Sequence, residues 1–158
     1  MCTMEPAAFQ NPRRRPCILR PASRTTPADV RIEIVRSRGK WRVVQDPAEL
    51  HTGGDQASWD LSELIAEFPP GTDFRIEFFG GPPGYDPVRG PFTKPIERSG
   101  ASLVAGARGT DWGCYYYDIW AMTQYEAYKL DFPIDPQIDN LPPPPRTVYP
   151  RHPEPDHG

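Results

Sequence analysis

Side chains able to act as nucleophiles or metal ligands are scarce between residues 30 and 140. That stretch holds one cysteine, Cys114, and one histidine, His51. A thiol becomes a nucleophile when a base or a positive charge lowers its pKa, so a reactive Cys114 would have to meet His51 in the folded protein. A cysteine in a strand ordinarily packs as a small apolar side chain. We therefore predict a reduced core thiol at Cys114 and an exposed turn residue at His51.

The cysteines and carboxylates form no recognisable metal-binding pattern. The chain has three cysteines, an odd number without repeating spacing, which is typical neither of a disulfide framework nor of a zinc site. Aspartates recur every four residues at Asp131, Asp135 and Asp139, but prolines between them prevent a helix and the EF-hand pattern is absent. They are better interpreted as turn residues. We predict no metal and no cofactor.

Motifs of common enzyme classes are also missing from the sequence. It contains no Gly-x-Ser-x-Gly elbow for a serine nucleophile and no Gly-x-x-x-x-Gly-Lys loop that would cradle a phosphate. The 17 carboxylates between residues 30 and 140 are scattered, and no pair stands out as a general acid and base. No catalytic residue is assigned.

Aromatic residues in one loop and one strand are better candidates for a binding surface. Residues 80–95 lack periodicity, and long ordered loops are often functional. The loop's rings either contact a partner or fold back over the core. In a strand over residues 113–121, alternate side chains point to opposite faces, so one aromatic face stays outside unless a loop or the segment 61–68 covers it. The predicted partner-binding residues are Tyr85, Arg89, Phe92, Tyr116 and Trp120.

Composition limits the elements that can position these residues. The chain has 158 residues, of which 22 are proline and 13 are glycine. Proline is poorly tolerated inside helices and central strands, which argues against a helical bundle, a coiled coil or any long-helix fold. The 4 Trp, 7 Tyr and 7 Phe residues are nevertheless too many for a wholly disordered protein. The length favours one domain.

The chain divides into three parts by composition. Residues 1–29 carry five arginines against two acidic side chains and show no periodicity, which predicts a disordered basic arm containing two of the cysteines. Residues 30–140, with 11 basic and 17 acidic side chains, form the folded domain. Residues 141–158 hold seven prolines and are predicted to be a disordered tail, with polyproline II structure over residues 142–145.

Within the folded domain, apolar and polar residues alternate with the period of half-buried strands. Turn residues 36–40 predict a hairpin between the first two strands. Residues 61–68 instead have helical spacing and precede two prolines, so we predict a short helix there. The fold class is all-β, an antiparallel Greek-key β-sandwich of about seven strands. The predicted strands lie around residues 30–34, 41–43, 57–59, 74–78, 102–105, 113–121 and within 124–139.

The order of these features resembles the cupredoxin-like β-sandwich over roughly residues 30–140. A glycine turn precedes a tryptophan-containing strand at Gly53–Trp59, the strand Phe74–Phe78 follows, and a Gly-x-Tyr-x-Tyr strand starts at Gly113. In that family a copper-ligating cysteine follows the last strand, with a histidine a few residues later. Here the matching position is Ile119, and the next histidine is His152. The resemblance therefore implies the fold without its copper site.

These observations favour a non-catalytic protein-interaction or structural module that docks through the aromatic loop or strand surface. The alternative is a small-molecule-binding protein or an enzyme whose pocket is lined by Tyr, Trp and carboxylates such as Asp118. We expect a protein partner, which includes a second copy of the chain. The net charge of -3 disfavours nucleic-acid binding, and three adjacent arginines at 13–15 bind nucleic acid only weakly. Because no apolar run fits a secretory signal or a membrane span, we expect a cytoplasmic protein without membrane association.

Overall fold

The computed structural model describes residues 13–145, which form ten β-strands and one short helix, α1 (Ser62–Glu67). The strands belong to two sheets, and each sheet contains both parallel and antiparallel pairs. The first sheet has the order β2-β1-β4-β7-β6 and comprises β1 (Asp29–Ser37), β2 (Lys40–Val43), β4 (Gln56–Asp60), β6 (Glu97–Ser99) and β7 (Ser102–Val104). The second has the order β3-β10-β8-β5, with β9 also paired to β8, and comprises β3 (Ala48–Leu50), β5 (Asp73–Gly80), β8 (Gly113–Met122), β9 (Ala127–Lys129) and β10 (Gln137–Asn140).

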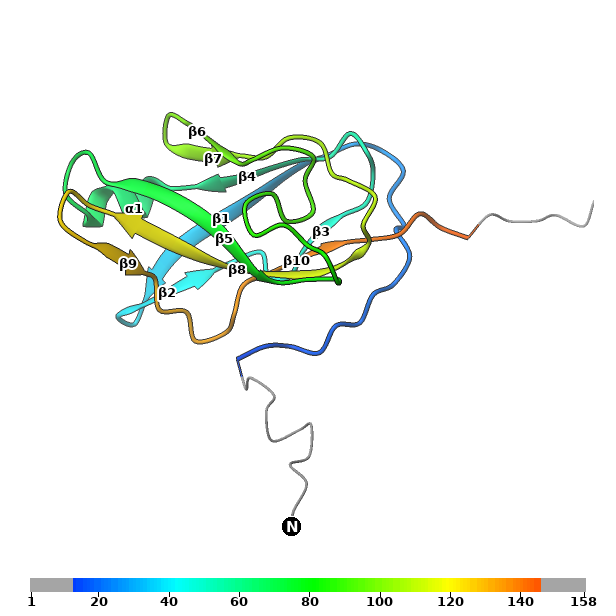
Figure 1. Ribbon diagram of the computed structural model, residues 1–158, viewed down its shortest axis with the longest axis horizontal. Helices are drawn as coiled ribbons and strands as arrows, with labels where there is room; N and C mark the ends of the chain where they lie inside the picture. The colour runs from blue at the N-terminus through cyan, green and yellow to red at the C-terminus, as the bar shows by residue number, and fades with distance from the viewer. Residues whose placement is uncertain (1–12, 146–158) are drawn as a thin grey trace, which may run out of the picture.

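The first sheet is organised around β1, which lies between β2 and β4 (Figure 1). β1 and β2 form the predicted hairpin, in which Ser37 lies opposite Lys40. The two turn residues, Arg38 and Gly39, have φ angles of 53° and 77°. Two successive positive φ values match the right-handed twist of hairpin strands, and glycine adopts them without steric cost.

The second sheet is organised around β8, its longest strand. β5 pairs antiparallel with one edge of β8 along most of its length. The other edge is shared, because β10 pairs with Gly113–Tyr116 and β9 pairs with Trp120–Met122. The connection between β9 and β10 therefore loops away beside Asp118, in the middle of the strand.

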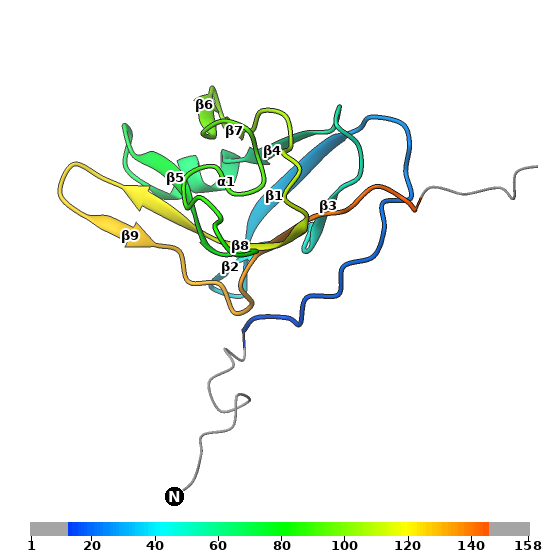
Figure 2. The same ribbon diagram turned by 45° about the vertical axis from the view of Figure 1, so that its right-hand side comes forward.

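Figure 2 shows the two sheets from a second direction. Their buried inward-facing side chains form one core. Trp59 on β4 donates a hydrogen bond from Nε1 to the hydroxyl of Tyr117 on β8 at 3.1 Å, and the two rings meet edge to face. Both residues are fully buried. Burial raises the pKa of Tyr117, so its hydroxyl remains protonated and available as a neutral partner.

The predicted helix over residues 61–68 is confirmed by α1, which packs into the space between the sheets. Its residue Leu64 is 0% exposed, whereas the neighbouring Ile65 is 39% exposed. Phe68, directly after the helix, stacks on Trp41 of the first sheet and meets Phe74 of the second sheet edge-on. The two prolines that follow cannot continue the helix.

A partly buried arginine binds the ends of the parallel strands β3 and β10. The Arg108 guanidinium donates to the carbonyl oxygens of Leu50, His51 and Leu141 and to the side chain of Asn140, all within 3.0 Å. Burial lowers the pKa of Arg108, but these four acceptors satisfy the charge. The loop after β7 is thereby attached to the opposite end of the second sheet.

The number of strands and their orientation differ from the sequence-based prediction. Ten strands are present, not seven, because three-residue strands at 48–50 and 97–99 were missed and the region 124–139 holds two strands. The sheets are mixed, since β1 pairs parallel with β4 and β3 pairs parallel with β10. After β2, residues 44–55 cross to the second sheet to form β3 before returning to β4, and such a crossover allows a parallel pair.

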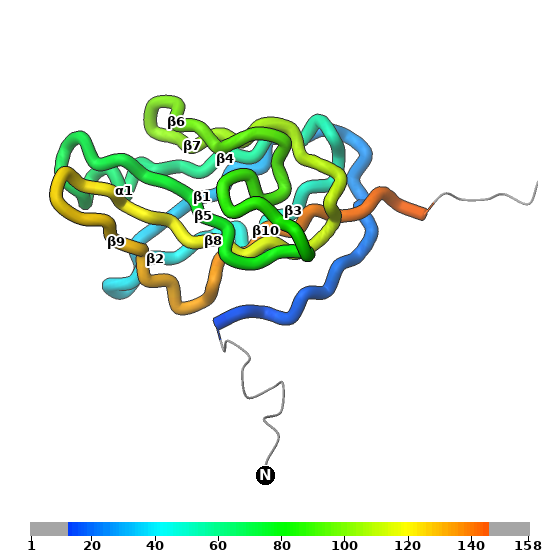
Figure 3. The backbone as a smooth tube through the Cα atoms, viewed as in Figure 1, coloured from blue at the N-terminus to red at the C-terminus, as the bar shows by residue number. Residues whose placement is uncertain are grey.

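Parts of the predicted arm and tail lie within the described residues and contact the folded domain. Residues 13–28 run along the outside of the second sheet and reach the start of β1 (Figure 3). At the other end Leu141 is buried, and the carbonyl of Pro142 accepts a hydrogen bond from the amide of Ala22 at 2.7 Å. The remainder of the predicted arm and tail, residues 1–12 and 146–158, lies outside the described residues. No helix within residues 13–145 is long and apolar enough to cross a membrane.

Candidate functional site

The outer face of the second sheet carries two of the five predicted partner-binding residues, Tyr116 and Trp120, together with Cys114 and Asp118. Strand alternation places Tyr115, Tyr117 and Ile119 of β8 in the core and turns the intervening residues outward. We define the outer face as the outward-pointing side chains of this sheet. It comprises Phe79, Cys114, Tyr116, Asp118, Trp120, Met122, Gln137 and Asp139.

One end of the outer face is covered by a strap, defined here as residues 13–17. A disulfide bond joins Cys17 of the strap to Cys114 of β8, across 97 residues of sequence. The prediction of a reduced thiol at Cys114 is therefore wrong. The odd number of cysteines concealed the pair, and no spacing rule connects a residue in the arm with one in the last long strand.

Arginines of the strap bind aromatic and acidic groups of the outer face. The Arg14 guanidinium lies 4.4 Å from the centre of the Tyr116 ring and 5.3 Å from that of Phe79. The hydroxyl of Tyr116 donates to the carbonyl of Arg15 at 2.9 Å. Arg15 itself forms a two-point ion pair with Asp46, at 2.8 and 2.9 Å. Tyr116, a predicted partner-binding residue, is thus buried by a segment of its own chain.

Two polar residues of β10 are buried at the same end of the face. Asp139 lies opposite Cys114 in the strand register, and Gln137 lies opposite Tyr116. Gln137 donates from Nε2 to a carboxylate oxygen of Asp139 at 2.7 Å. Burial raises the pKa of Asp139, although Gln137 and Arg15 oppose the shift. The Oε1 atom of Gln137 has no hydrogen-bond partner within residues 13–145.

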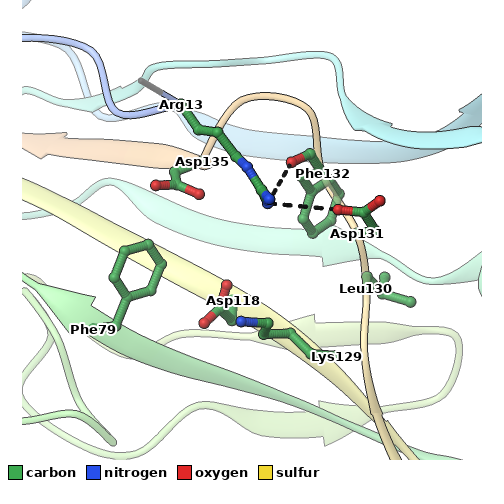
Figure 4. A pocket seen from close by; sticks show the side chains of 8 residues that line it. All are labelled: Arg13, Phe79, Asp118, Lys129, Leu130, Asp131, Phe132 and Asp135. Carbon is green, nitrogen blue, oxygen red and sulfur yellow. Dashed lines mark hydrogen bonds and ion pairs between the residues drawn. The ribbon is translucent and has the colours of Figure 1, made fainter. Parts of the chain in front are cut away.

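Beside the strap, the loop between β9 and β10 borders a cavity of about 750 Å³. Figure 4 shows Asp118 and Lys129 side by side on β8 and β9, with Arg13 reaching toward Asp131 from the strap. The Arg13 guanidinium contacts the carboxylate of Asp131 and the carbonyl of Phe132, both at 3.5 Å. The full lining is Arg13, Phe79, Asp118, Lys129, Leu130, Asp131, Phe132 and Asp135.

The cavity presents more negative than positive groups. Three carboxylates face two cations, and one of the cations belongs to the strap. Burial raises the pKa of Asp118. The nearby carboxylates of Asp135 and Glu77 raise that pKa further, whereas Lys129 lowers it. Such a lining attracts a cationic group and offers charge-assisted hydrogen bonds to it.

The other end of the outer face is not covered by the strap. Trp120 is partly exposed, donates from Nε1 to Glu77 at 3.1 Å, and lies between Arg75 and Lys129 in the strand register. A shallow groove of about 420 Å³ runs beside it. Its apolar lining, which we call the Trp120 patch, consists of Ile76, Pro87, Val88, Trp120, Met122 and Ala127.

The predicted loop residues are distributed differently. Phe92 is buried and meets Trp59 edge to face, so it belongs to the core. Tyr85 is partly buried and packs against the same core. Arg89 is exposed and forms an ion pair with Asp86 of its own loop. The loop mainly closes the core, as the alternative interpretation held, and Val88 rather than the two rings contributes to the exposed patch.

The only histidine of the folded domain has a structural environment. His51 accepts hydrogen bonds at Nδ1 from the amides of Ser23 and Arg24 and lies 3.3 Å from Glu49. It does not line the cavity that contains Asp118. Among residues 13–145, no group of three or more His, Cys, Asp or Glu side chains is arranged to hold a metal ion.

Sequence reasoning found Tyr116 and Trp120 on one face but missed the residues that divide that face. Cys17, Arg14 and Arg15 lie in a segment without hydrophobic periodicity, and Lys129 lies in a three-residue strand. Only the adjacency of an arginine run to a cysteine hinted that the segment could be anchored. Comparisons of the chain with known protein families, curated proteins and solved structures found no match.

Proposed function

We propose that this protein is a non-catalytic binding module that docks a protein partner on the exposed end of the outer face. The observation that carries the proposal is the position of Trp120, a partly exposed indole surrounded by the other apolar side chains of the Trp120 patch. Val88, at the edge of this patch, is 56% exposed. Tryptophan in a small apolar depression is a frequent energetic centre of protein interfaces.

Charge complementarity specifies the partner. The cavity next to the Trp120 patch holds three carboxylates against two cations, and residues 30–140 as a whole carry six more acidic than basic side chains. A partner segment that places an apolar side chain beside Trp120 and a lysine or arginine near Asp118 fits both features. Opposite charges across the rim also accelerate association.

The proposal can be tested with a displayed library of random twelve-residue peptides selected on the full chain. The expected consensus combines a basic residue with an aliphatic or aromatic residue. Selected peptides should bind Trp120→Ala at least about tenfold more weakly, as expected for an interface centre worth more than 1 kcal/mol.

Ile65→Ala is the matched control, because Ile65 is an exposed apolar residue on α1, away from the outer face. Asp118→Asn should weaken the peptides that carry a basic residue and spare any that do not. Equal binding to the wild type and Trp120→Ala, or a consensus without basic residues, would contradict the proposal.

A second candidate function is suggested by the cavity alone. A volume of about 750 Å³ is sufficient for a small organic ligand, and its mixed charges suit an amine or guanidine. Thermal-shift screening with arginine, spermidine and agmatine tests this function. A shift that Asp118→Asn abolishes and Trp120→Ala leaves intact would favour a small-molecule binder over a protein-docking module.

We also propose that the two sheets are a variant of the Greek-key β-sandwich of cupredoxin-like type without copper ligands. Support comes from the single core between the sheets and from Gly113, Tyr115 and Tyr117 on the central strand β8. Cys114 is held in a disulfide and is not available as a thiolate. Titration with Cu²⁺ should therefore produce no intense thiolate-to-copper absorption band.

The disulfide suggests the compartment in which the protein works. Disulfides persist in oxidising compartments and are rare where glutathione and thioredoxin keep thiols reduced. The Cys17–Cys114 bond therefore favours an oxidising compartment and departs from the cytoplasmic localisation expected from the sequence. Thiol labelling of protein taken directly from cells, followed by mass spectrometry, measures the oxidised fraction.

A further inference from the structure

We propose that the strap is a displaceable occupant of an arginine-binding groove on the outer face, and that an arginine-bearing peptide takes its place when the Cys17–Cys114 disulfide is opened. This inference shares only the choice of face with the proposed function. Its groove is the covered end of that face, formed by Phe79, Tyr116, Asp46, Gln137 and Asp139, and it excludes the Trp120 patch.

The groove is shaped for guanidinium groups. Arg14 lies over the rings of Tyr116 and Phe79, and this approach requires Gly80, where a Cβ atom would come within 3.0 Å of the guanidinium and 3.1 Å of the Tyr116 ring. A planar, weakly hydrated guanidinium stacks on aromatic rings better than an ammonium does. The adjacent carboxylate of Asp46 binds Arg15 at two points. The surface therefore recognises two successive arginines.

The noncovalent contacts of the strap are ones that another arginine-bearing segment can reproduce. Arg14 stacks on the rings of Tyr116 and Phe79, and Arg15 forms a two-point ion pair with Asp46. The carbonyl of Arg15 also accepts a hydrogen bond from the hydroxyl of Tyr116. Side-chain contacts of this kind exchange with those of a competing guanidinium, whereas a covalent bond does not. The disulfide is thus the contact that makes the strap a permanent cover.

The strap also leaves the groove incompletely satisfied. The Oε1 atom of Gln137, a residue only 3% exposed, has no hydrogen-bond partner within the described part of the chain. The nearby Asp139 carboxylate is buried and accepts its recorded side-chain hydrogen bond from Gln137 alone. A guanidinium has five N–H donors. An arginine of a bound peptide that reaches further than Arg15 would donate hydrogen bonds to Gln137 Oε1 and to the Asp139 carboxylate.

Opening of the cover is a thiol–disulfide exchange. A thiolate of a dithiol reductant attacks the sulfur of the exposed residue Cys17, and Cys114 leaves as a thiolate that takes up a proton. The second thiol of the reductant then displaces Cys17, so the reductant ends as a disulfide and the protein holds two thiols. Two electrons pass from the dithiol to the protein.

The test uses a full-length strap-disabled variant that combines Arg14→Ala, Arg15→Ala and Cys17→Ser. The probe is a fluorescent peptide RRRPSIL, which corresponds to residues 13–19 with serine in place of the cysteine. Because a tethered strap has an effective concentration near the millimolar range, intact wild type should exclude the probe. The strap-disabled variant should bind it at least about tenfold more tightly in fluorescence anisotropy.

Two further variants locate the bound probe. Adding Tyr116→Leu to the strap-disabled variant should abolish binding, and adding Trp120→Ala should leave it unchanged. The peptide KKKPSIL should bind several-fold more weakly than RRRPSIL. If the strap-disabled variant folds, as judged by circular dichroism, and does not bind RRRPSIL, or if Trp120→Ala rather than Tyr116→Leu abolishes binding, the inference is overturned.

Limited trypsin digestion of the wild type tests the role of the disulfide without any mutation. Cleavage after Arg13 and Arg14 should accelerate at least about fivefold when dithiothreitol reduces the bond, because the opened strap samples cleavable conformations more often. Equal cleavage rates with and without reductant would show that the disulfide does not hold the cover. Failure of the Trp120 peptide selection would leave both of these results intact, so the two proposals fail separately.

Discussion

Asp55 and Asp139 are both buried carboxylates, yet their surroundings shift the pKa in opposite directions. Burial alone raises the pKa of Asp55, but the guanidinium of Arg24 at 2.7 and 2.8 Å and the amides of His51 and its neighbour outweigh it and hold the pKa far below its usual range. Asp139 receives one side-chain hydrogen bond, and burial raises its pKa. Ionised Asp55 therefore stabilises the folded protein, whereas ionised Asp139 destabilises it.

Asp55→Asn is expected to destabilise the protein at pH 7 by about 2 kcal/mol, because the amide directs donors at Arg24 and at backbone N–H groups. The folded-state pKa of Asp55 lies below the unfolded value of about 4. Its contribution is therefore present above pH 4 and is lost as the pH falls through the folded-state pKa. Urea unfolding of both proteins between pH 7 and pH 2.5 should show the difference shrinking at low pH.

The control for this prediction is Asp73→Asn, since Asp73 is an exposed carboxylate paired with exposed Arg75. Its effect should stay below about 0.5 kcal/mol at every pH. A difference between wild type and Asp55→Asn that is constant with pH would show that Asp55 is not ionised in the folded protein.

Asp139→Asn should act in the opposite sense and raise the free energy of unfolding at pH 7, because burial raises the pKa of the Asp139 carboxyl and disfavours its charged form. Asparagine still accepts the Gln137 hydrogen bond but carries no buried charge. Because the folded-state pKa of Asp139 is above the unfolded value, its penalty is absent at low pH and develops as the pH rises through these two values. Melting temperatures of the two proteins should converge at pH 3.5 and separate at pH 7. A less stable Asp139→Asn at pH 7 would contradict this assignment.

At the scale of elements, the helix and the strands with buried and exposed residues in alternation were predictable, including the short strands β2 and β7, whereas the short strands β3 and β6 were not. A period of two is visible in β1, β4, β5 and β8 because each shows several alternations of burial. Three-residue strands such as β6 and β9, whose residues are all exposed, show none. Parallel pairing was missed for another reason: it depends on where a crossover returns, and local sequence does not encode this.

Leu64→Ala provides the element-scale prediction. Leu64 is the fully buried residue of α1 between the two sheets, so its truncation should lower the free energy of unfolding by about 2–4 kcal/mol. Ile65→Ala, one position along the same helix, removes a side chain that is 39% exposed and should cost less than about 1 kcal/mol. Denaturant unfolding of both variants measures the contrast. Similar losses would mean that α1 does not close the core.

Sequence alternation placed two residues of the outer face, Tyr116 and Trp120, but it did not reveal the strap that covers one of them. Alternation along β8 placed Tyr116 and Trp120 on the same face, and the exposed aromatic end is where Trp120 lies. The strap could not be inferred, because its attachment depends on a disulfide and arginine contacts rather than on apolar burial. Composition indicates whether a segment can form a hydrophobic core of its own. It does not indicate whether the segment is attached to a core that other residues form.

At the scale of the whole molecule, the disulfide connects the first described residues with the central strand of the second sheet. The bond closes a long stretch of chain, so it restricts the unfolded state strongly. Ring contacts and hydrogen bonds within the core involve no residue of the strap. Loss of the disulfide should therefore lower the free energy of unfolding and leave the folded structure of the core unchanged.

Cys17→Ser is expected to lower the free energy of unfolding by about 2–4 kcal/mol while leaving the far-ultraviolet circular dichroism spectrum at 25 °C unchanged. Cys2→Ser is the matched control, since Cys2 is the one cysteine outside the bond, and it should have no effect. Urea unfolding without reductant measures both variants. A larger effect of Cys2→Ser, or loss of the β spectrum in Cys17→Ser, would contradict the pairing or the independence of the core.

Gly80 offers a genetic reporter for the position of the strap. A methyl group at this position would lie 3.0 Å from a terminal nitrogen of Arg14 and 3.1 Å from a carbon of the Tyr116 ring, and both groups would have to shift. A larger side chain would displace the Arg14 guanidinium from the ring. In sequences related to this protein, a residue larger than glycine at position 80 should therefore occur together with loss of Arg14, of Cys17, or of both.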